Sequence, residues 1–277
     1  MSEVYFNKEH VGLTSRWTAA ARARESQRED RLFNDPWAAT LTGLEGTDWL
    51  NSADDDGASI IIRTRYFDDF LQRVTANEGI RQVVILAAGL DTRAFRFTWP
   101  ELTRVFELDQ PQVLEYKEEI LTRAGAKPAC ERIVLKIDLT TPWIEPLQTA
   151  GFDAQQPAIW LLEGFLHYLP GGAGPDILKK ISSMTAPGSW LGFDCINKHT
   201  LTSRYTRAWI AKLTEAGVPW LGTLDDPKAF LKKCAWKATV TQLGENGAHF
   251  GRYPYPVIPR VIPYMPRNWF VTAQKER

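Results

Sequence analysis

Small and acidic residues follow four short apolar runs of the chain. The run VVILAA precedes Gly89, and RVFEL precedes Asp109, which lies 20 residues further on. RIVLKI is followed by Asp138 and Leu139, and AIWLL is followed by Glu163. A carboxylate at about this distance from a glycine turn is typical of ribose recognition, whereas a single acid can equally be a helix N-cap. As a set, these residues predict a site for an adenosine-containing ligand.

The loop after the first apolar run reads AAGLDTR and begins at Ala87. It lacks the G-x-G-x-x-G pattern of dinucleotide sites, and Asp91 would repel a pyrophosphate, which binds bare backbone N–H groups. A ligand with a cationic centre and no phosphate fits better, and S-adenosylmethionine is such a ligand. Its own carboxylate requires a cation, for which Arg63 and Arg65 are the candidates.

A parallel sheet would bring these residues together, and the chain alternates between strand and helix patterns accordingly. The predicted strands are 83–88, 104–109, 132–138, 158–164 and 189–196, and the predicted helices are 14–44 with a turn at 34–37, 60–74, 111–125 and 174–184. This alternation indicates an α/β fold with helices on both faces of the sheet.

The other segments complete a single domain. We expect a polar loop over 45–59, helices over 198–235, and two final strands over 236–244 and 268–275, one of which can be antiparallel. The domain then divides into an N-terminal helical cap (1–75), a cofactor-binding core (80–196), a helical insertion (197–235) and a terminal strand pair (236–277).

The composition narrows the class of partner and compartment. The net charge is zero among 277 residues, so no basic excess points to nucleic acid or to an anionic membrane. The longest apolar runs are far shorter than a membrane span, and the first residues lack the pattern of a signal peptide. Three scattered cysteines suggest a reducing compartment. We therefore expect a cytoplasmic protein without a nucleic-acid or membrane partner; no pattern specifies an oligomeric state.

Several stretches resemble one known family. These are VVILAAGLDTRAFRF, VFELDQPQV, the Asp-Leu pair at 138–139, LLEGFLHYL, and the terminal stretches TAAARARESQREDRLFNDPWA and GRYPYPVIPRVIPYMPRNWFVTA. Together they resemble the leucine carboxyl methyltransferase-like family of S-adenosylmethionine-dependent O-methyltransferases, in its bacterial and fungal small-molecule branch. The resemblance covers nearly the whole chain. It implies a class I methyltransferase (Rossmann-like) fold with a seven-stranded, mostly parallel sheet whose last strand is antiparallel.

The resemblance also implies roles for individual residues. Asp109 would hold the ribose hydroxyls, Asp138 and Leu139 would border the adenine, Gly89 would line the methionine moiety, and Glu163 would lie near its amino group. For the methionine carboxylate it favours Arg63 over Arg65. One position departs from the family, because Ala87 stands where a glycine is common and adds a methyl group beside the ligand.

The methyl acceptor is predicted from what its nucleophile would need. A carboxylate, whose ordinary pKa is about 4, is already ionised at neutral pH, whereas a phenol, whose ordinary pKa is about 10, benefits from a base or a metal. None of the four histidines stands in a metal-ligand pattern, so we expect no metal and a small carboxylic acid as substrate. Phenol methylation, a non-catalytic ligand-binding module and a nicotinamide oxidoreductase remain the alternatives.

Cations and hydrogen-bond donors would hold the acid. Our candidates for the catalytic site are Arg22, His167 and Tyr168, and the further candidates are Arg16, Arg24, Arg204 and Tyr205. For each arginine the alternative is a surface ion pair, and for His167 it is a hydrogen-bonded helix residue.

The stretch GRYPYPVIPRVIPYMPRNW (251–269) carries five prolines in thirteen residues. It lies between two predicted strands and is interleaved with Tyr, Val and Ile, so we interpret it as a packed connection beside the substrate pocket rather than a partner-binding polyproline segment. Its aromatic residues, with Trp209 and Trp220, would frame a flat aromatic acid, unless they simply fill the core.

Overall fold

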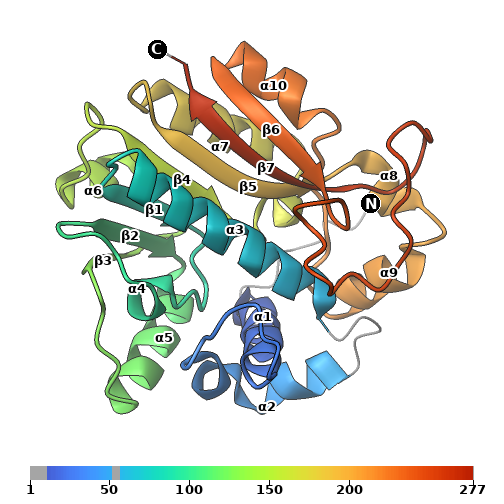
Figure 1. Cartoon of the computed structure of the whole chain (residues 1–277), viewed down its shortest axis with the longest axis horizontal. Coiled ribbons are helices and arrows are strands. Elements are labelled where there is room, and N and C mark those ends of the chain that lie inside the picture. Colours follow the sequence, from blue (N-terminus) through green and yellow to red (C-terminus); the bar gives the residue numbers. More distant parts are fainter. Residues whose placement is uncertain (1–10, 52–56, 277) are drawn as a thin grey trace.

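Seven strands form one sheet through the centre of the computed structural model, which describes residues 11–51 and 57–276 (Figure 1). The strand order is β3-β2-β1-β4-β5-β7-β6. The strands are β1 (Gln82–Leu86), β2 (Arg104–Asp109), β3 (Glu131–Lys136), β4 (Ala158–Leu162), β5 (Trp190–Ile196), β6 (Trp236–Gln242) and β7 (Asn268–Lys275). Of the seven described strands, β7 is the one that runs opposite to all the others. The predicted class I methyltransferase fold is therefore confirmed.

Apolar residues alternate between the two faces of the central strands because successive side chains of a strand point to opposite sides. In β1, Val84 and Leu86 pack in one core cluster, and Val83 and Ile85 pack in another. The first cluster includes residues of α6 (Ile144–Thr149) and α7 (Ala173–Ser183), whereas the second includes residues of α3 (Ala58–Asn77). Burial on both faces explains why the strands of this sheet are continuous apolar runs.

The strand order reverses between β1 and β4, which both pair in parallel within the sheet. Ligands of open α/β sheets bind beyond the carboxyl ends of the strands at such a reversal. The chain leaves β1 into the AAGLDTR loop and α4 (Arg93–Arg96), leaves β2 into α5 (Pro111–Arg123), and leaves β4 into the short 3-10 helix η2 (Leu166–Tyr168). The short α4 and α6 were not predicted.

The N-terminal region has the predicted break before a second helix, but its first helix ends at Ser26, well before the predicted turn at 34–37. It forms α1 (Val11–Ser26) and α2 (Ala38–Asn51), with irregular chain between them. Hydrogen bonds hold the exit from α1, because Leu32 N donates to the buried Glu25 and Asp35 N donates to Ser26 Oγ. Arg252, far away in the sequence, also binds Glu25. These tertiary contacts override the helix propensity of the stretch.

The predicted polar loop over 45–59 was wrong for its first part. Residues 45–51 belong to α2, residues 58–59 belong to α3, and residues 52–56 lie outside the described residues. The physical reason is burial, since Leu50 is in the core and Trp49 stacks on Trp17 of α1. The predicted helix over 60–74 is longer and begins at Ala58.

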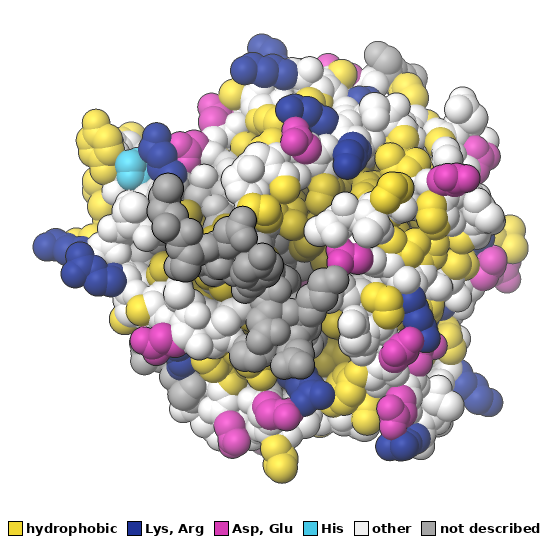
Figure 2. All heavy atoms as spheres, turned by 180° about the vertical axis from the view of Figure 1, so that it is seen from behind, with side chains coloured by type: hydrophobic (Ala, Val, Ile, Leu, Met, Phe, Trp, Pro, Cys, Tyr) yellow, Lys and Arg dark blue, Asp and Glu magenta, His cyan; other side chains and the backbone are white. Residues whose placement is uncertain are grey.

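The insertion after β5 contains α8 (Lys198–Thr202), α9 (Arg207–Glu215) and α10 (Pro227–Lys233). Tyr205 and, in the later connection, Val261 and Tyr264 are exposed, and hydrophobic side chains project at the edge that carries α8 (left in Figure 2). Positive and negative side chains are interspersed over the described part of this face (Figure 2). Within 11–51 and 57–276, no helix has the length and apolar character that crossing a membrane requires.

Candidate cofactor and acceptor site

A cavity of about 1320 Å³ opens at the carboxyl edge of the sheet. Pockets for one drug-sized ligand usually measure roughly 300–1,000 Å³, so this cavity has room for two ligands side by side. We call one part of it the strand-end half, formed by residues 87–93, 109, 138–139 and 163–164. The other part is the aromatic half, formed by Trp17, Trp49, His167, Tyr168, Trp209 and Trp220.

The loop after β1 exposes its backbone to the strand-end half. Ala87 has φ 53° and Gly89 has φ 50°, both in the left-handed region. Strain of this kind at a non-glycine residue costs roughly 1–3 kcal/mol and is common at ligand sites. A Cβ atom at Gly89 would lie 3.2 Å from Ser15 Cβ of α1, so glycine lets the helix approach the loop closely.

Asp109 ends β2 and faces the same loop. Its Oδ2 accepts from Gly89 N at 2.6 Å, and its Oδ1 accepts from Gln110 N at 2.6 Å. Burial raises the pKa of Asp109 to about 6, although these two backbone donors act in the opposite direction. At neutral pH the carboxylate is therefore ionised but poorly solvated, which suits an acceptor for sugar hydroxyls.

Asp138 and Leu139 follow β3 and line the cavity half-buried. Asp138 Oδ1 accepts from Thr140 N at 3.0 Å and from Thr140 Oγ1 at 2.7 Å, which fixes the carboxylate. Leu139 packs against the apolar core. The pair thus presents one polar and one apolar surface, as a site for a purine ring with an exocyclic amine requires.

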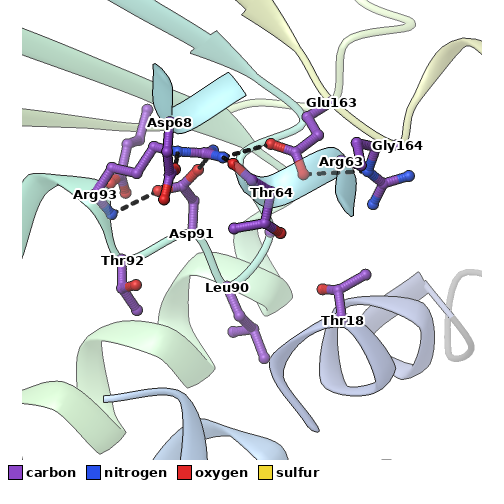
Figure 3. A network of polar contacts seen from close by, with 12 residues as sticks. Thr18, Arg63, Thr64, Asp68, Leu90, Asp91, Thr92, Arg93, Glu163 and Gly164 are labelled. Atoms are coloured by element: carbon purple, nitrogen blue, oxygen red, sulfur yellow. Dashed lines mark hydrogen bonds and ion pairs between the residues drawn. The ribbon is translucent and has the colours of Figure 1, made fainter. Parts of the chain in front are cut away.

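A buried ion-pair network surrounds Arg93 in the AAGLDTR loop (Figure 3). Its Nε donates to Asp68 at 2.7 Å, its Nη2 donates to Glu163 at 2.7 Å, and its Nη1 donates to Asp91. Arg96 also binds Asp68. Burial alone would raise the pKa of Asp91, but Arg93 and other cations lower it to about 2. Asp91 and Glu163 therefore stand as fixed carboxylates in the cavity wall.

Arg63 lies next to Glu163, on the side away from Arg93 (Figure 3). Its Nε donates to Glu163 at 3.1 Å and its Nη1 donates to Asp194 at 3.3 Å. Burial alone would lower the pKa of Arg63, but Asp194 and Glu163 raise it. Arg65, the alternative to Arg63, does not line the cavity and instead pairs with Asp69. Between these two arginines, the geometry favours Arg63 as the cation for a ligand carboxylate.

Asp194 was missed by the sequence analysis. It lies within β5, is 1% exposed, and accepts from Gly164 N at 2.6 Å as well as from Arg63. Gly164 has φ 68°, and a Cβ atom there would lie 2.8 Å from Arg63 Nη2. The only hint in the sequence is an acid within the apolar run WLGFDCI.

Arg22 connects α1 to the loop after β1. Its Nη2 donates to the Leu90 carbonyl at 2.6 Å, and its Nε donates to Asp35 at 2.8 Å. Asp35 also accepts from Thr92 Oγ1 at 2.6 Å. Arg22 lines the cavity, but its guanidinium is committed to these partners. We therefore assign it to positioning the loop, and a direct contact with an acceptor remains an untested prediction.

His167 and Tyr168 mark the boundary between the two halves. His167 is 3% exposed, and its ring packs 4.5 Å from those of Tyr168 and Trp220. Burial, reinforced by Arg63, lowers the pKa of His167 well below its ordinary value. Burial raises the pKa of Tyr168. At neutral pH both side chains are therefore uncharged, and the Tyr168 phenol keeps its proton.

A row of indole rings lines the aromatic half. Trp17 and Trp49 stack with centroids 3.5 Å apart, Trp49 and Trp209 lie 5.9 Å apart, and Trp209 and Trp220 lie 6.2 Å apart. Trp209 and Trp220 were predicted either to frame a ligand or to fill the core, and all four rings line the cavity. The row comes from α1, α2, α9 and the chain that follows α9.

The proline-rich connection between β6 and β7 was predicted to be packed, but most of its side chains between Pro254 and Tyr264 are exposed, and hydrogen bonds from Arg267 hold it instead. Arg267 Nη1 donates to Gln242 Oε1 and to the Ile258 carbonyl, both at 2.6 Å. Its Nη2 donates to the carbonyls of Pro259 at 2.8 Å and Ile262 at 2.9 Å. These four bonds hold the connection against the sheet edge, where several of its residues line the cavity.

The other cationic candidates lie away from the cavity wall. Arg16 pairs with Glu45, Arg24 donates to Asn51, and Arg204 donates to Tyr205. Tyr205 itself lines the cavity and is exposed. In the described part of the chain, His, Cys, Asp and Glu side chains form no group of three or more that could hold a metal ion.

Comparisons with known proteins identify the family of this chain. Residues 15–182 match the leucine carboxyl methyltransferase family. A protein of Streptomyces coelicolor, provisionally named an S-adenosyl-L-methionine-dependent methyltransferase, is 39% identical over 269 residues and covers 90% of this chain and 91% of its own. A protein of Mycobacterium tuberculosis with the same provisional name is 35% identical over 96% of this chain and 95% of its own.

The fold has solved counterparts. A structure from Thermobifida fusca, provisionally described as a methyltransferase, covers 95% of this chain and 94% of its own with a TM-score of 0.61 and 19% identity. The strand-end half supplies a buried acid, an acid–leucine pair and two fixed carboxylates, which fit a ligand with ribose, adenine and a cationic amino-acid end. The chain belongs to the leucine carboxyl methyltransferase family and is a methyltransferase whose cofactor is S-adenosyl-L-methionine.

Proposed function

We propose that this methyltransferase acts on a carboxylate oxygen of a small acid and forms a methyl ester. The observation that carries the proposal is the chemistry at the boundary of the two halves. His167 is held neutral and weakly basic by burial, and Tyr168 is held as a neutral phenol. A site with a proton donor and a poor base suits an acceptor that is already ionised.

The residues of the strand-end half would hold the cofactor. Asp109 accepts from the ribose, Asp138 and Leu139 border the adenine, and Gly89 and Ala87 line the methionine chain. Glu163 receives the amino group, and Arg63 receives the carboxylate. When bound, S-adenosylmethionine supplies an electrophilic methyl group on a cationic sulfur.

The residues of the aromatic half would orient the acceptor. Tyr168 can donate a hydrogen bond to one oxygen of the acid, which leaves the other oxygen free to attack. The indole row excludes water and leaves the carboxylate poorly solvated. Positioning and desolvation of this kind can supply most of the catalysis for a displacement that needs no proton transfer.

A set of matched acceptors tests the proposal. Benzoic acid, phenol and 4-hydroxybenzoic acid are incubated with the enzyme and methyl-labelled cofactor, and the products are treated with mild base. Methyl esters release labelled methanol under base, whereas methyl ethers do not. We expect benzoic acid to become labelled and mild base to release that label as methanol. Base-stable label on the phenolic compounds would replace the proposal with phenol methylation.

Calorimetry separates an enzyme from a binding module. We expect S-adenosylmethionine and S-adenosylhomocysteine to bind with micromolar affinity and NAD not to bind. Asp109→Ala should weaken both sulfur ligands by more than about tenfold, because an ionised hydrogen-bond partner is lost. If the cofactor binds but no acid, phenol or hydroxy acid is methylated, a non-catalytic role is favoured.

We also propose that the protein is located in the cytoplasm. Cys130, Cys195 and Cys234 are free thiols, and burial raises the pKa of Cys130 to about 12. Free cysteines are usual in a reducing compartment. Fractionation of cells that express the full chain should recover the protein with cytoplasmic markers, and recovery from the medium or an envelope fraction would contradict this placement.

A further inference from the structure

Five arginines line the cavity, and one of them differs from the rest. Four pair with acidic side chains: Arg22, Arg63, Arg93 and Arg96. The fifth, Arg267, is 5% exposed, and no acidic side chain of residues 11–51 or 57–276 lies within ion-pair distance of it. A buried cation normally has an anionic partner, so this one requires an explanation.

Within the described residues, the hydrogen-bond partners of Arg267 are all neutral. Its two Nη atoms bind the Gln242 amide oxygen and three backbone carbonyls. These oxygens take up the four Nη hydrogens of the guanidinium but leave its formal charge. Burial lowers the pKa of Arg267 by more than the more distant Glu245 raises it, whereas neighbouring acids raise the pKa of Arg63. An arginine nevertheless stays protonated at neutral pH.

The fold places Arg267 beyond the cofactor. It directly precedes β7, whose Asn268 pairs with Ile196 at the carboxyl end of β5, and its N donates to Asn197 Oδ1 at 3.0 Å. Apart from Arg63 of α3, the predicted cofactor residues lie at or after the ends of β1, β2, β3 and β4. Arg267 therefore stands at the same edge of the sheet, over the strands that the cofactor does not use.

We propose that Arg267 selects an anionic acceptor. Among the arginines that line the cavity, it is the one that forms no ion pair with a described acid. The partner that completes it is the carboxylate of the substrate. Arg267 acts through its field, since its Nη hydrogens are already used by the connection between β6 and β7. It is a specificity-determining residue and does not take part in the methyl transfer itself.

This inference rests on the proposed function only in part. It requires that the acceptor carry a negative charge, whereas the proposed function requires in addition that the charged group be the one methylated. A hydroxy acid methylated on its phenol, with its carboxylate near Arg267, would satisfy the inference and overturn the proposed function.

Acid–amide pairs test the selection directly. Benzoate, 2-naphthoate and octanoate are compared with benzamide, 2-naphthamide and octanamide by calorimetry, with the protein saturated in S-adenosylhomocysteine. The wild-type protein should bind at least one acid about tenfold or more tightly than its amide. If no acid is preferred over its amide, the inference is wrong.

Three variants separate charge from structure. Arg267→Gln should abolish the preference for the acid while leaving the affinity for the amide within about twofold. Arg267→Lys keeps the charge and should retain most of the preference. The control is Lys198→Gln, because Lys198 is an exposed cation that follows β5, pairs with Asp225 and does not line the cavity, so the preference should not change.

Two results would overturn the inference. Equal weakening of acid and amide in Arg267→Gln would show that the residue only supports the fold of the connection. Loss of the preference in Arg267→Lys to the extent seen in Arg267→Gln would show that charge is not what matters. The product from 4-hydroxybenzoate then separates the proposals, because ester formation independent of Arg267 would retain the proposed function alone.

Discussion

The strand-end half of the cavity is built from paired charges, whereas the aromatic half is built from rings, and one arginine with neutral partners lies elsewhere in the cavity wall. In the strand-end half, the single side chain of Arg93 contacts three acids: Asp68, Asp91 and Glu163. In the aromatic half, four indole rings form a row, whereas Arg267, elsewhere in the cavity wall, binds an amide and three carbonyls.

This difference reflects what each half has to recognise. A cofactor with fixed charges and hydroxyls is met by carboxylates that are held in place before it arrives, which limits reorganisation on binding. An acceptor with a large apolar body is bound through apolar contact with the rings, and one positive charge orients it. Substitutions in the strand-end half should therefore affect folding and cofactor affinity. Substitutions in the aromatic half should affect the affinity for the acceptor.

The largest effect is expected from the centre of the ion-pair network. Arg93→Gln would leave three buried acids short of a cation, which should lower the free energy of unfolding by about 3 kcal/mol. Urea denaturation followed by circular dichroism measures this. The control is Arg123→Gln, because Arg123 pairs with Glu119 on an exposed surface and should contribute little. Equal effects of the two substitutions would mean that the network is not a core element.

Gly164→Ala should have the next largest effect, on cofactor affinity. The new methyl group would lie 2.8 Å from Arg63 Nη2 at a residue with φ 68°. We expect the dissociation constant of S-adenosylhomocysteine to rise about thirtyfold, which corresponds to roughly 2 kcal/mol. Gly125→Ala is the matched control, since Gly125 has φ 70° with nothing within 4 Å of a Cβ atom. Alanine at position 125 has the same backbone strain but no steric clash, so calorimetry should show unchanged cofactor affinity.

The pH dependence of cofactor binding should be moderate. Burial raises the pKa of Asp109 to about 6 in the free protein, and ribose hydroxyls bind its ionised form. The ionised fraction is about one half at pH 6 and about one tenth at pH 5, so affinity should fall roughly tenfold between pH 7 and pH 5. Asp109→Asn should bind more weakly and lose this dependence. A flat profile in the wild-type protein would contradict the assignment of Asp109 to the ribose.

The smallest effect is expected from the indole row. Trp209→Leu would remove ring contacts to Trp49 and Trp220 and should raise the KM of an aromatic acid about fivefold, or roughly 1 kcal/mol. The dissociation constant of the cofactor should not change. Steady-state kinetics and calorimetry on the same preparation measure both. If cofactor affinity falls as much as KM rises, the two halves are not independent.

The same comparison explains what the sequence could predict. Residues of the strand-end half follow their strands directly, so hydrophobic runs identify both the strand and the group at its end, as with Asp109 and Glu163. The alternation of runs also predicted the sheet. Asp194 was not predicted, because its partner Arg63 lies 131 residues away and only the folded sheet brings them together.

Contacts between side chains and backbone atoms could not be predicted from the sequence either. Arg22 binds the Leu90 carbonyl, and Arg267 binds three carbonyls, so no side-chain pattern reveals either partner. The ends of α1 and α2 were misplaced for a related reason. Glu25 binds Leu32 N and the distant Arg252, which stops a helix that local propensity would continue.

The hydrogen bonds from Arg267 to three main-chain carbonyls also affect how the substrate range of the enzyme can change. Every residue has a main-chain carbonyl, so the three that Arg267 binds in residues 258–262 persist whichever side chains this segment carries. Val257 and Ile262 line the cavity and are partly exposed. A gene library that varies these two positions would keep one scaffold while it samples many substrate shapes. Descendants of this chain could change their acceptor by the same route without rebuilding the cofactor site.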